Sequence, residues 1–221
     1  MNSNPATNTE FNFNWADRPI KLRGRPEKNP DINTRARMME EASSLFQEHG
    51  FIGTTLRMIS DKVGVTAAAV YWYFPSKSHI LYSILERGLD EIEAALEDAM
   101  IEAAPRERLG QFVHAVVLFR LRRTDIAPVK LGVGQLIEVL PKEMQTSLNE
   151  RQHRYLDLVR GILQAGIEEG SFRDLDVTTT GFAILTLCDY VFVWFRHEGR
   201  LTPEEVASEY ERLVIASVMK C

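Results

Sequence analysis

Hydrophobic residues recur every three or four positions along most of this chain, which is the spacing of a helix buried on one side. The first such stretch, residues 31–50, carries an apolar stripe from Met38 to Phe46, and Gly50 stands where the stripe stops. Nowhere do apolar and polar residues alternate in the way that a half-buried strand requires. We therefore expect an all-α protein.

Two short apolar patterns follow within residues 56–75. Ile59 and Val63 are four positions apart and share one face of a first helix, and Gly64 is placed to end that helix in the left-handed conformation. Thr66 can cap a second helix, and Val70 then returns to the core. Two short helices joined by a tight glycine turn are typical of a DNA-reading helix-turn-helix, although enzymes contain such pairs as well.

Longer helical patterns fill the rest of the chain. Ser76 can cap a helix with apolar positions as far as Leu96, and Gly132 and Gly134 predict a bent or short helix around them. The further helices that we expect span residues 106–123, 126–140, 141–169, 177–195 and 204–219.

The segment from Val177 to Phe195 is apolar on nearly all faces. Such a helix must be covered on both sides, so we expect its own core on one side and a partner subunit on the other. Its longest apolar run, from Gly181 to Phe195, is too short to span a bilayer and carries Asp189 at its middle, which predicts a buried helix.

Charge is unevenly distributed along the sequence. The formal net charge is −5, yet seven basic and only two acidic residues lie between Arg18 and Arg37. We expect residues 1–30 to form a disordered basic arm, in which Arg23 and Arg25 flank a glycine and resemble the core of an AT-hook that enters the minor groove. The alternative is a solvated basic linker.

Residues 35–85 resemble the DNA-binding domain of the tetracycline-repressor (TetR) family of transcriptional regulators. The matching residues are Ala42, Leu45, Phe46, Gly50, Phe51, Thr54, Thr55, Ile59, Val63, Gly64, Val65, Thr66, Val70, Tyr71, Tyr73, Phe74, Ser76 and Lys77. Tyr73 departs from the family, which often has His there, and Ser78 and His79 stand where an acidic residue commonly follows the lysine. The resemblance implies a three-helix helix-turn-helix domain (residues 31–80) and a helical effector-binding and dimerisation domain (residues 81–221).

The same resemblance implies double-stranded DNA as a partner and a role for each residue near the turn. Thr55, Thr66 and Lys77 would contact phosphates, Arg57 a phosphate or a base, Ala67 and Ala68 base edges, and Tyr71 and Tyr73 the backbone or a base. Two structural alternatives stay open, because Tyr73 could belong to the core and Lys77 could be solvated.

TetR-like proteins dimerise mainly through their last two helices, which implies residues 177–195 and 204–219 as the interface of a homodimer on a palindromic operator. By the same resemblance, the C-terminal domain binds a small-molecule effector, and binding changes the spacing of the two recognition helices. Candidate pocket residues are apolar groups interrupted by a few polar ones: Phe112, Val116, Phe119, Gln135, Tyr155, Asp189, Tyr190 and Trp194.

Three charged features of this domain have more than one interpretation. Asp189 in an apolar helix needs a partner, which could be an arginine of the same domain, a cationic ligand or a group across the dimer. Arg120, Arg122 and Arg123 could receive an anionic head group, or they could be solvated or pair with carboxylates. His114 is more typical of a satisfied core residue than of a ligand contact.

Residues 165–172 and 193–206 look like the C-terminal domain of TetR-family regulators of lipid and steroid breakdown, some of which respond to CoA thioesters. An acyl-CoA or another fatty or sterol-derived acid is therefore the first effector that we expect. An apolar drug or metabolite is the rival.

No catalytic, cofactor or metal site is expected, because the chain has no paired carboxylates, metal-ligand cluster, glycine-rich phosphate loop or Cys/His arrangement. Cys188 lies in an apolar run without basic neighbours, which predicts an unreactive thiol. Two cysteines and no signal peptide indicate a cytoplasmic protein. Besides a ligand-responsive repressor, the alternatives are a small helical enzyme and an architectural DNA-binding protein, which would lack the acidic second domain.

Overall fold

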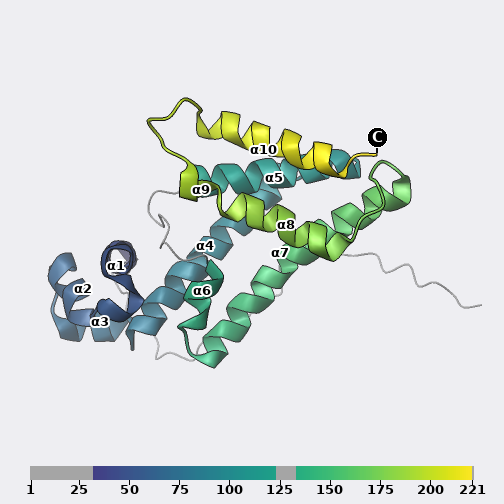
Figure 1. Ribbon diagram of the computed structural model, residues 1–221. Coiled ribbons are helices and arrows are strands. Elements are labelled where there is room, and N and C mark those ends of the chain that lie inside the picture. Colours follow the sequence, from purple (N-terminus) through teal and green to yellow (C-terminus); the bar gives the residue numbers. More distant parts are fainter. Residues whose placement is uncertain (1–31, 123–132, 221) are drawn as a thin grey trace, which may run out of the picture.

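The computed structural model describes residues 32–122 and 133–220, and most of these residues are helical (Figure 1). The helices are α1 (Ile32–Gly53), α2 (Leu56–Val63), α3 (Ala67–Tyr73), α4 (Lys77–Ala99), α5 (Pro105–Arg122), α6 (Val133–Glu138), α7 (Lys142–Glu169), α8 (Val177–Asp189), α9 (Val191–Trp194) and α10 (Pro203–Val218). Within these two ranges there is no strand, and the extended backbone makes only an isolated antiparallel bridge between Phe172 and Met219. The expected all-α fold is confirmed.

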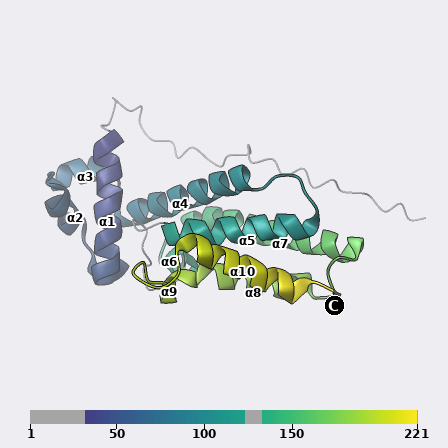
Figure 2. The same cartoon turned by 90° about the horizontal axis from the view of Figure 1, so that it is seen from above.

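Buried side chains form two hydrophobic cores. The N-terminal core packs Phe46, Ile59 and Phe74, among others, between α1, α2, α3 and the first half of α4. The second core surrounds Phe112 and Ile162 and lies among α5, α7, α8 and α10. The two views agree that α1, α2 and α3 sit at one end of α4, with the remaining bundle along its other half (Figures 1 and 2).

Helix α4 belongs to both cores. Its side chains from Ile80 to Leu89 pack in the N-terminal core, whereas Ile92 and Leu96 pack in the second. Helix α6 and Leu148 of α7 also pack against the N-terminal core. The side chains of α4 therefore pass from the N-terminal core to the second core between residues 89 and 92. We had predicted the domain boundary between residues 80 and 81.

Several helix ends have residues that are typical of them, whereas Gly50 (φ 72°) kinks α1, which continues to Gly53 instead of ending at Gly50. Gly64 (φ 79°) and Gly170 (φ 83°) adopt the left-handed conformation and end α2 and α7. Thr202 and Glu205 form a reciprocal capping box at the start of α10. Ser76 differs, since it occupies the cap position of α4 but its hydroxyl pairs with a histidine ring instead of a backbone amide.

The prediction of one buried helix over residues 177–195 is wrong. Helix α8 ends at Asp189, Tyr190 lies in a turn, and the single-turn α9 follows. One side of this segment is buried in the second core, but the side chains of Phe182, Tyr190 and Val193 are about half exposed. An all-apolar segment is covered by its own core on one side only, so its outer face needs another partner.

The span Val177–Trp194 is apolar enough to cross a membrane by length and composition alone. One such helix is weak evidence for a membrane protein, because apolar helices of soluble proteins pass the same test.

Candidate functional site

Two threonines begin the helices of the helix-turn-helix. The Thr55 hydroxyl accepts the backbone N–H of Met58 at 3.2 Å, and the Thr66 hydroxyl accepts that of Ala69 at 3.2 Å. A hydroxyl that accepts a hydrogen bond still has its own hydrogen to donate. Because both threonines are exposed, each can cap its helix and donate to an external oxygen at once.

Further exposed side chains lie on the outer faces of α2 and α3. Arg57 is 88% exposed and makes one long ion pair, 3.9 Å from its Nε to Asp61. Ala67 and Ala68 are exposed at the slim start of α3, and the side chain of Tyr71 projects further along it. The opposite face of α3 is anchored by buried Val70. The predicted DNA contacts on α2 and α3 are thus accessible together.

Trp72 also lies on this surface, although it was not among the predicted DNA contacts. Its side chain is 58% exposed and makes an edge contact with the Tyr73 ring. The signal was present in the spacing, since Val70 and Phe74 are both buried and residue 72 must point the other way. Tyr73 itself packs partly against the N-terminal core. Its side chain therefore contributes to the core and keeps part of its surface accessible for a DNA contact.

Lys77 has a different set of contacts from the one expected. Its ammonium donates to the backbone carbonyls of Phe51, of Ile52 at 3.3 Å and of Thr54 at 2.7 Å. Burial lowers the pKa of Lys77. Its three hydrogens are therefore engaged with the end of α1, and a phosphate contact would require Lys77 to leave these carbonyls.

The structure describes only the later arginines of the basic segment that precedes the motif. Arg23 and Arg25 lie outside the described residues. Arg35 donates to the Ser83 hydroxyl at 3.0 Å, and Arg37 donates to the Val63 carbonyl at 3.2 Å, where it caps the end of α2. These last two arginines therefore take part in packing the N-terminal domain.

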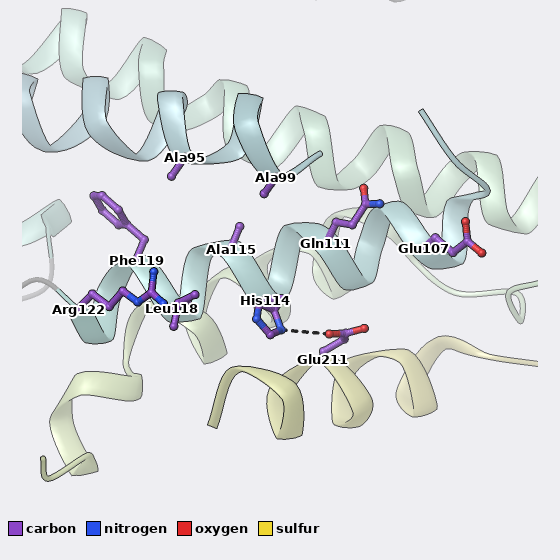
Figure 3. A pocket seen from close by; sticks show the side chains of 10 residues that line it. All are labelled: Ala95, Ala99, Glu107, Gln111, His114, Ala115, Leu118, Phe119, Arg122 and Glu211. Carbon is purple, nitrogen blue, oxygen red and sulfur yellow. Dashed lines mark hydrogen bonds and ion pairs between the residues drawn. The ribbon is translucent and has the colours of Figure 1, made fainter. Parts of the chain in front are cut away.

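A cavity of about 640 Å³ lies between α4, α5 and α10 (Figure 3). The residues that line it are Ala95, Ala99, Glu107, Gln111, His114, Ala115, Leu118, Phe119, Arg122 and Glu211. Its size is that of a site for a small organic molecule, and its wall combines apolar surface with a few polar groups. It is therefore the candidate ligand site of the second domain.

One of the eight predicted pocket residues, Phe119, lines this cavity. Phe112 and Val116 are buried in the second core, on the other side of α5. Tyr190 and Trp194 are half exposed on the outer face of the domain, and Trp194 donates to the Tyr210 hydroxyl at 2.9 Å. None of these four residues lines the cavity.

Tyr155 and Asp189 also do not line the cavity. Tyr155 on α7 packs between the two cores, where burial raises its pKa above the ordinary value. Gln135 belongs to α6, and its side chain lies outside the described part of the protein. Asp189 accepts from Arg120 at 2.9 Å and 2.6 Å, so its partner is an arginine of the same domain.

His114 was expected to be a satisfied core residue, but it lines the cavity. Its Nδ1 lies 3.2 Å from Oε2 of Glu211 on α10 (Figure 3). Glu211 lies tightly against Gly110, where an added Cβ would stand 2.8 Å from its Oε1. A glycine on α5 thus lets α10 approach closely and place a carboxylate in the cavity.

Across residues 32–122 and 133–220, no group of three or more His, Cys, Asp or Glu residues could hold a metal ion. Cys188 is fully buried, and this burial raises the pKa of its thiol to about 12. The expected packing position of Cys188 agrees with this burial, and its low reactivity stays a prediction.

Models of two protein domains match the sequence. The one described as "Bacterial regulatory proteins, tetR family" matches residues 38–84, and the one described as "Tetracyclin repressor-like, C-terminal domain" matches residues 102–218. The first covers the helix-turn-helix surface, and the second covers α5, α10 and most of the cavity wall.

Individual proteins are similar over nearly the same length. The HTH-type transcriptional repressor KstR2 of Rhodococcus jostii (strain RHA1) is 28% identical, with 82% of this chain and 89% of KstR2 covered. The TetR family regulator PfmR of Thermus thermophilus is 33% identical with a TM-score of 0.72, covering 81% of this chain and 97% of PfmR. AibR, crystallised with isovaleryl coenzyme A and operator DNA, has a TM-score of 0.73 at 24% identity (81% and 97% covered), which is a likeness of fold.

Proposed function

This chain belongs to the tetR family of bacterial regulatory proteins, and from that premise we propose a ligand-released repressor. It is a DNA-binding transcriptional regulator. In the proposal, a cytoplasmic homodimer binds a palindromic operator and dissociates from it when an apolar acid or its CoA thioester binds. The KstR2 proteins are repressors, and AibR was crystallised with an acyl-CoA.

The observation that carries the DNA-binding part is the pair of capping threonines. Thr55 and Thr66 each have a hydroxyl hydrogen left to donate to a phosphate oxygen. Arg57 adds a positive charge beside them, while Ala67 and Ala68 leave room for α3 to approach base edges. We include Trp72 and Tyr71 in this surface because both are 58% exposed on the same short helix.

A second copy of the chain is the proposed cover for the apolar outer face of α8, α9 and α10. This face presents six large apolar side chains, each more than a third exposed: Phe182, Leu187, Tyr190, Val193, Trp194 and Leu213. A twofold dimer would bury this face against itself and set two recognition helices on successive half-sites. Phe182→Glu combined with Leu213→Glu should convert the dimer to a monomer in light scattering and weaken operator binding.

The experiment that tests the function is fluorescence polarisation with labelled DNA from upstream of the gene, at fixed salt and with excess nonspecific duplex. Acyl-CoAs and the matching free acids are titrated into the same samples. We expect tight binding to a palindromic site and release by one of these ligand classes. Binding no tighter than that to competitor DNA would favour an architectural DNA-binding protein and contradict the repressor.

A further inference from the structure

Helix α5 has a second face, beside the one that carries Phe112 and Val116, and only part of this face packs in the second core. Seven of the cavity residues come from this helix, at positions that recur every three or four residues: Glu107, Gln111, His114, Ala115, Leu118, Phe119 and Arg122. That spacing is one continuous stripe of a helix. The stripe contains sixteen residues from end to end, and its fifteen steps of 1.5 Å make it about 22 Å long.

The flanking helices leave this stripe open for different reasons. On α4, Ala95 and Ala99 are four positions apart and place small side chains opposite α5 (Figure 3). On α10, the side chain that reaches the cavity is Glu211, which is engaged with His114. The result is an elongated cavity, since the alanines do not fill the space between α4 and α5.

Polarity changes along the cavity. Near the C-terminal half of α5 the wall is apolar, because it is formed by Leu118, Phe119, Ala95 and neighbouring alanines. Arg122 lies at that end of the cavity. Glu107 stands at the opposite end, as Figure 3 shows. An elongated apolar molecule with one anionic end would therefore place that end at Arg122, because Glu107 repels it from the other end.

Arg122 can exchange its present partner for a ligand. It donates to Glu204 at 2.9 Å, but both side chains are more than half exposed, and an exposed ion pair of this kind contributes little stability. Glu204 also lies in the first turn of α10, where the helix dipole stabilises a carboxylate without Arg122. Replacing this ion pair by a contact between Arg122 and an external anion therefore costs little folding free energy.

We propose that the cavity between α4, α5 and α10 is the effector site, and that it holds an elongated apolar monoanion or its thioester with the anionic end at Arg122. The proposal rests on the proposed function and adds the location and orientation of the ligand. The cavity accommodates the apolar body, and a nucleotide portion would lie outside the cavity, beyond Arg122. Its α4 wall belongs to the helix that also supports the N-terminal core, so an occupied cavity acts directly on the DNA-binding domain.

The test uses the full chain with decanoate and decanoyl-CoA as probes, measured by calorimetry and by release of operator DNA. Arg122→Gln removes the anion partner, and Ala99→Leu fills the cavity. We expect each to weaken binding of the effective probe about 10-fold or more, the size of a charge-assisted hydrogen bond or a blocked apolar contact. Comparison of the two probes separates the free acid from the thioester.

Two matched variants control for general effects on the helices. Arg106→Gln changes an exposed arginine at the start of α5, and Ala94→Leu enlarges an exposed alanine on α4, both outside the cavity wall. Both controls should bind the probe within about twofold of the unmodified protein. All four variants should keep the circular-dichroism spectrum and the unfolding temperature of the unmodified protein, which verifies that they fold.

The outcomes separate the two proposals. If the unmodified protein releases operator DNA with a probe but Arg122→Gln and Ala99→Leu respond as it does, the site assignment is wrong and the repressor stands. If the unmodified protein binds its operator specifically but binds neither probe, the proposed ligand class and the proposed effector site are both wrong. If it holds no operator specifically, the proposed function itself fails.

Discussion

Arg151 of α7 donates to both carboxylate oxygens of Glu93 on α4, at the level where the two cores meet. A further bond of 2.8 Å reaches Asp90 on the same helix. Burial alone lowers the pKa of the Arg151 guanidinium, but the hydrogen bonds and charges of Glu93 and Asp90 raise it above its ordinary value. Arg151 is therefore a buried, charged link between α7 and the helix that both cores share.

Replacing Arg151 by Met should destabilise the protein by about 3 kcal/mol, because it leaves Glu93 largely buried without its main partner. Urea unfolding followed by circular dichroism measures the loss. Arg154→Gln is the control, since Arg154 is 37% exposed, lies 3.7 Å from Glu93 and should cost less than about 1 kcal/mol. Equal losses in the two variants would contradict a special role for Arg151.

Gly166, near the end of α7, leaves the space that the Phe172 ring fills. A Cβ added at Gly166 would stand 2.1 Å from Cδ2 of Phe172, and the Phe172 amide donates to the Gly166 carbonyl at 2.9 Å. Gly166→Ala should therefore destabilise the protein by about 1–3 kcal/mol, the range for overpacking a core. Thermal unfolding gives the change, and Phe172→Leu in the same chain should recover part of it.

Gly161 provides the matched control, because it lies in the same helix with nothing within 4 Å of an added Cβ. Gly161→Ala should stabilise the protein by about 0.5–1 kcal/mol through helix propensity. If both substitutions changed stability in the same direction, the proposed packing of Phe172 against Gly166 would be wrong.

Local signals in the sequence were sufficient for the helix ends and for the helix-turn-helix. Gly64 acts through its own left-handed backbone, and Thr66 acts through the amide of Ala69 three positions later, so spacing alone identifies them. The Gly166–Phe172 contact is nearly as local, yet it was not predicted. The sequence does not show that a glycine inside a helix makes room for a particular ring.

The cavity could not be predicted in the same way, because it depends on how the consecutive helices α4 and α5 and the distant α10 leave one face of α5 uncovered. Phe112 and Val116 have the composition of pocket residues but lie on the covered face. Ala95 and Ala99 line the cavity because they are small, and a small side chain carries no signal of ligand binding. Asp189 was identified as a residue that needs a partner, although three possible partners had been left open.

Cys188 should make stability depend on pH above about 9. Its thiol has a pKa of about 12 in the folded protein against an ordinary value of 9.0, because burial disfavours the thiolate. Between these values the unfolded chain loses a proton that the folded chain keeps, so the contribution of Cys188 is complete below pH 9 and is lost as the pH rises towards 12. Urea midpoints at pH 8 and pH 10.5 should differ less in Cys188→Ala than in the unmodified protein.

The same burial should protect the Cys188 thiol from reaction with alkylating and disulfide-forming reagents. In a Cys221→Ser background, a thiol-specific reagent at pH 8 should label the native protein slowly and the urea-unfolded protein completely within the mixing time. Rapid labelling of the folded protein would show that the segment around α8 opens, and would contradict the buried position of Cys188.

Arg57 and Lys62 are both basic residues of α2, but the structure predicts that only Arg57 contributes to DNA binding. Lys62 is occupied by the Ser44 hydroxyl at 3.0 Å and by Glu41 and Glu48 at 3.6 and 3.7 Å, whereas Arg57 is 88% exposed. Arg57→Gln should weaken operator binding and lower the slope of log K against log salt by about 0.9, the value for one phosphate contact. Lys62→Gln should leave that slope unchanged. Polarisation titrations at several salt concentrations measure both slopes, and a matching loss in Lys62→Gln would show that overall charge, not the exposed position of Arg57, controls binding.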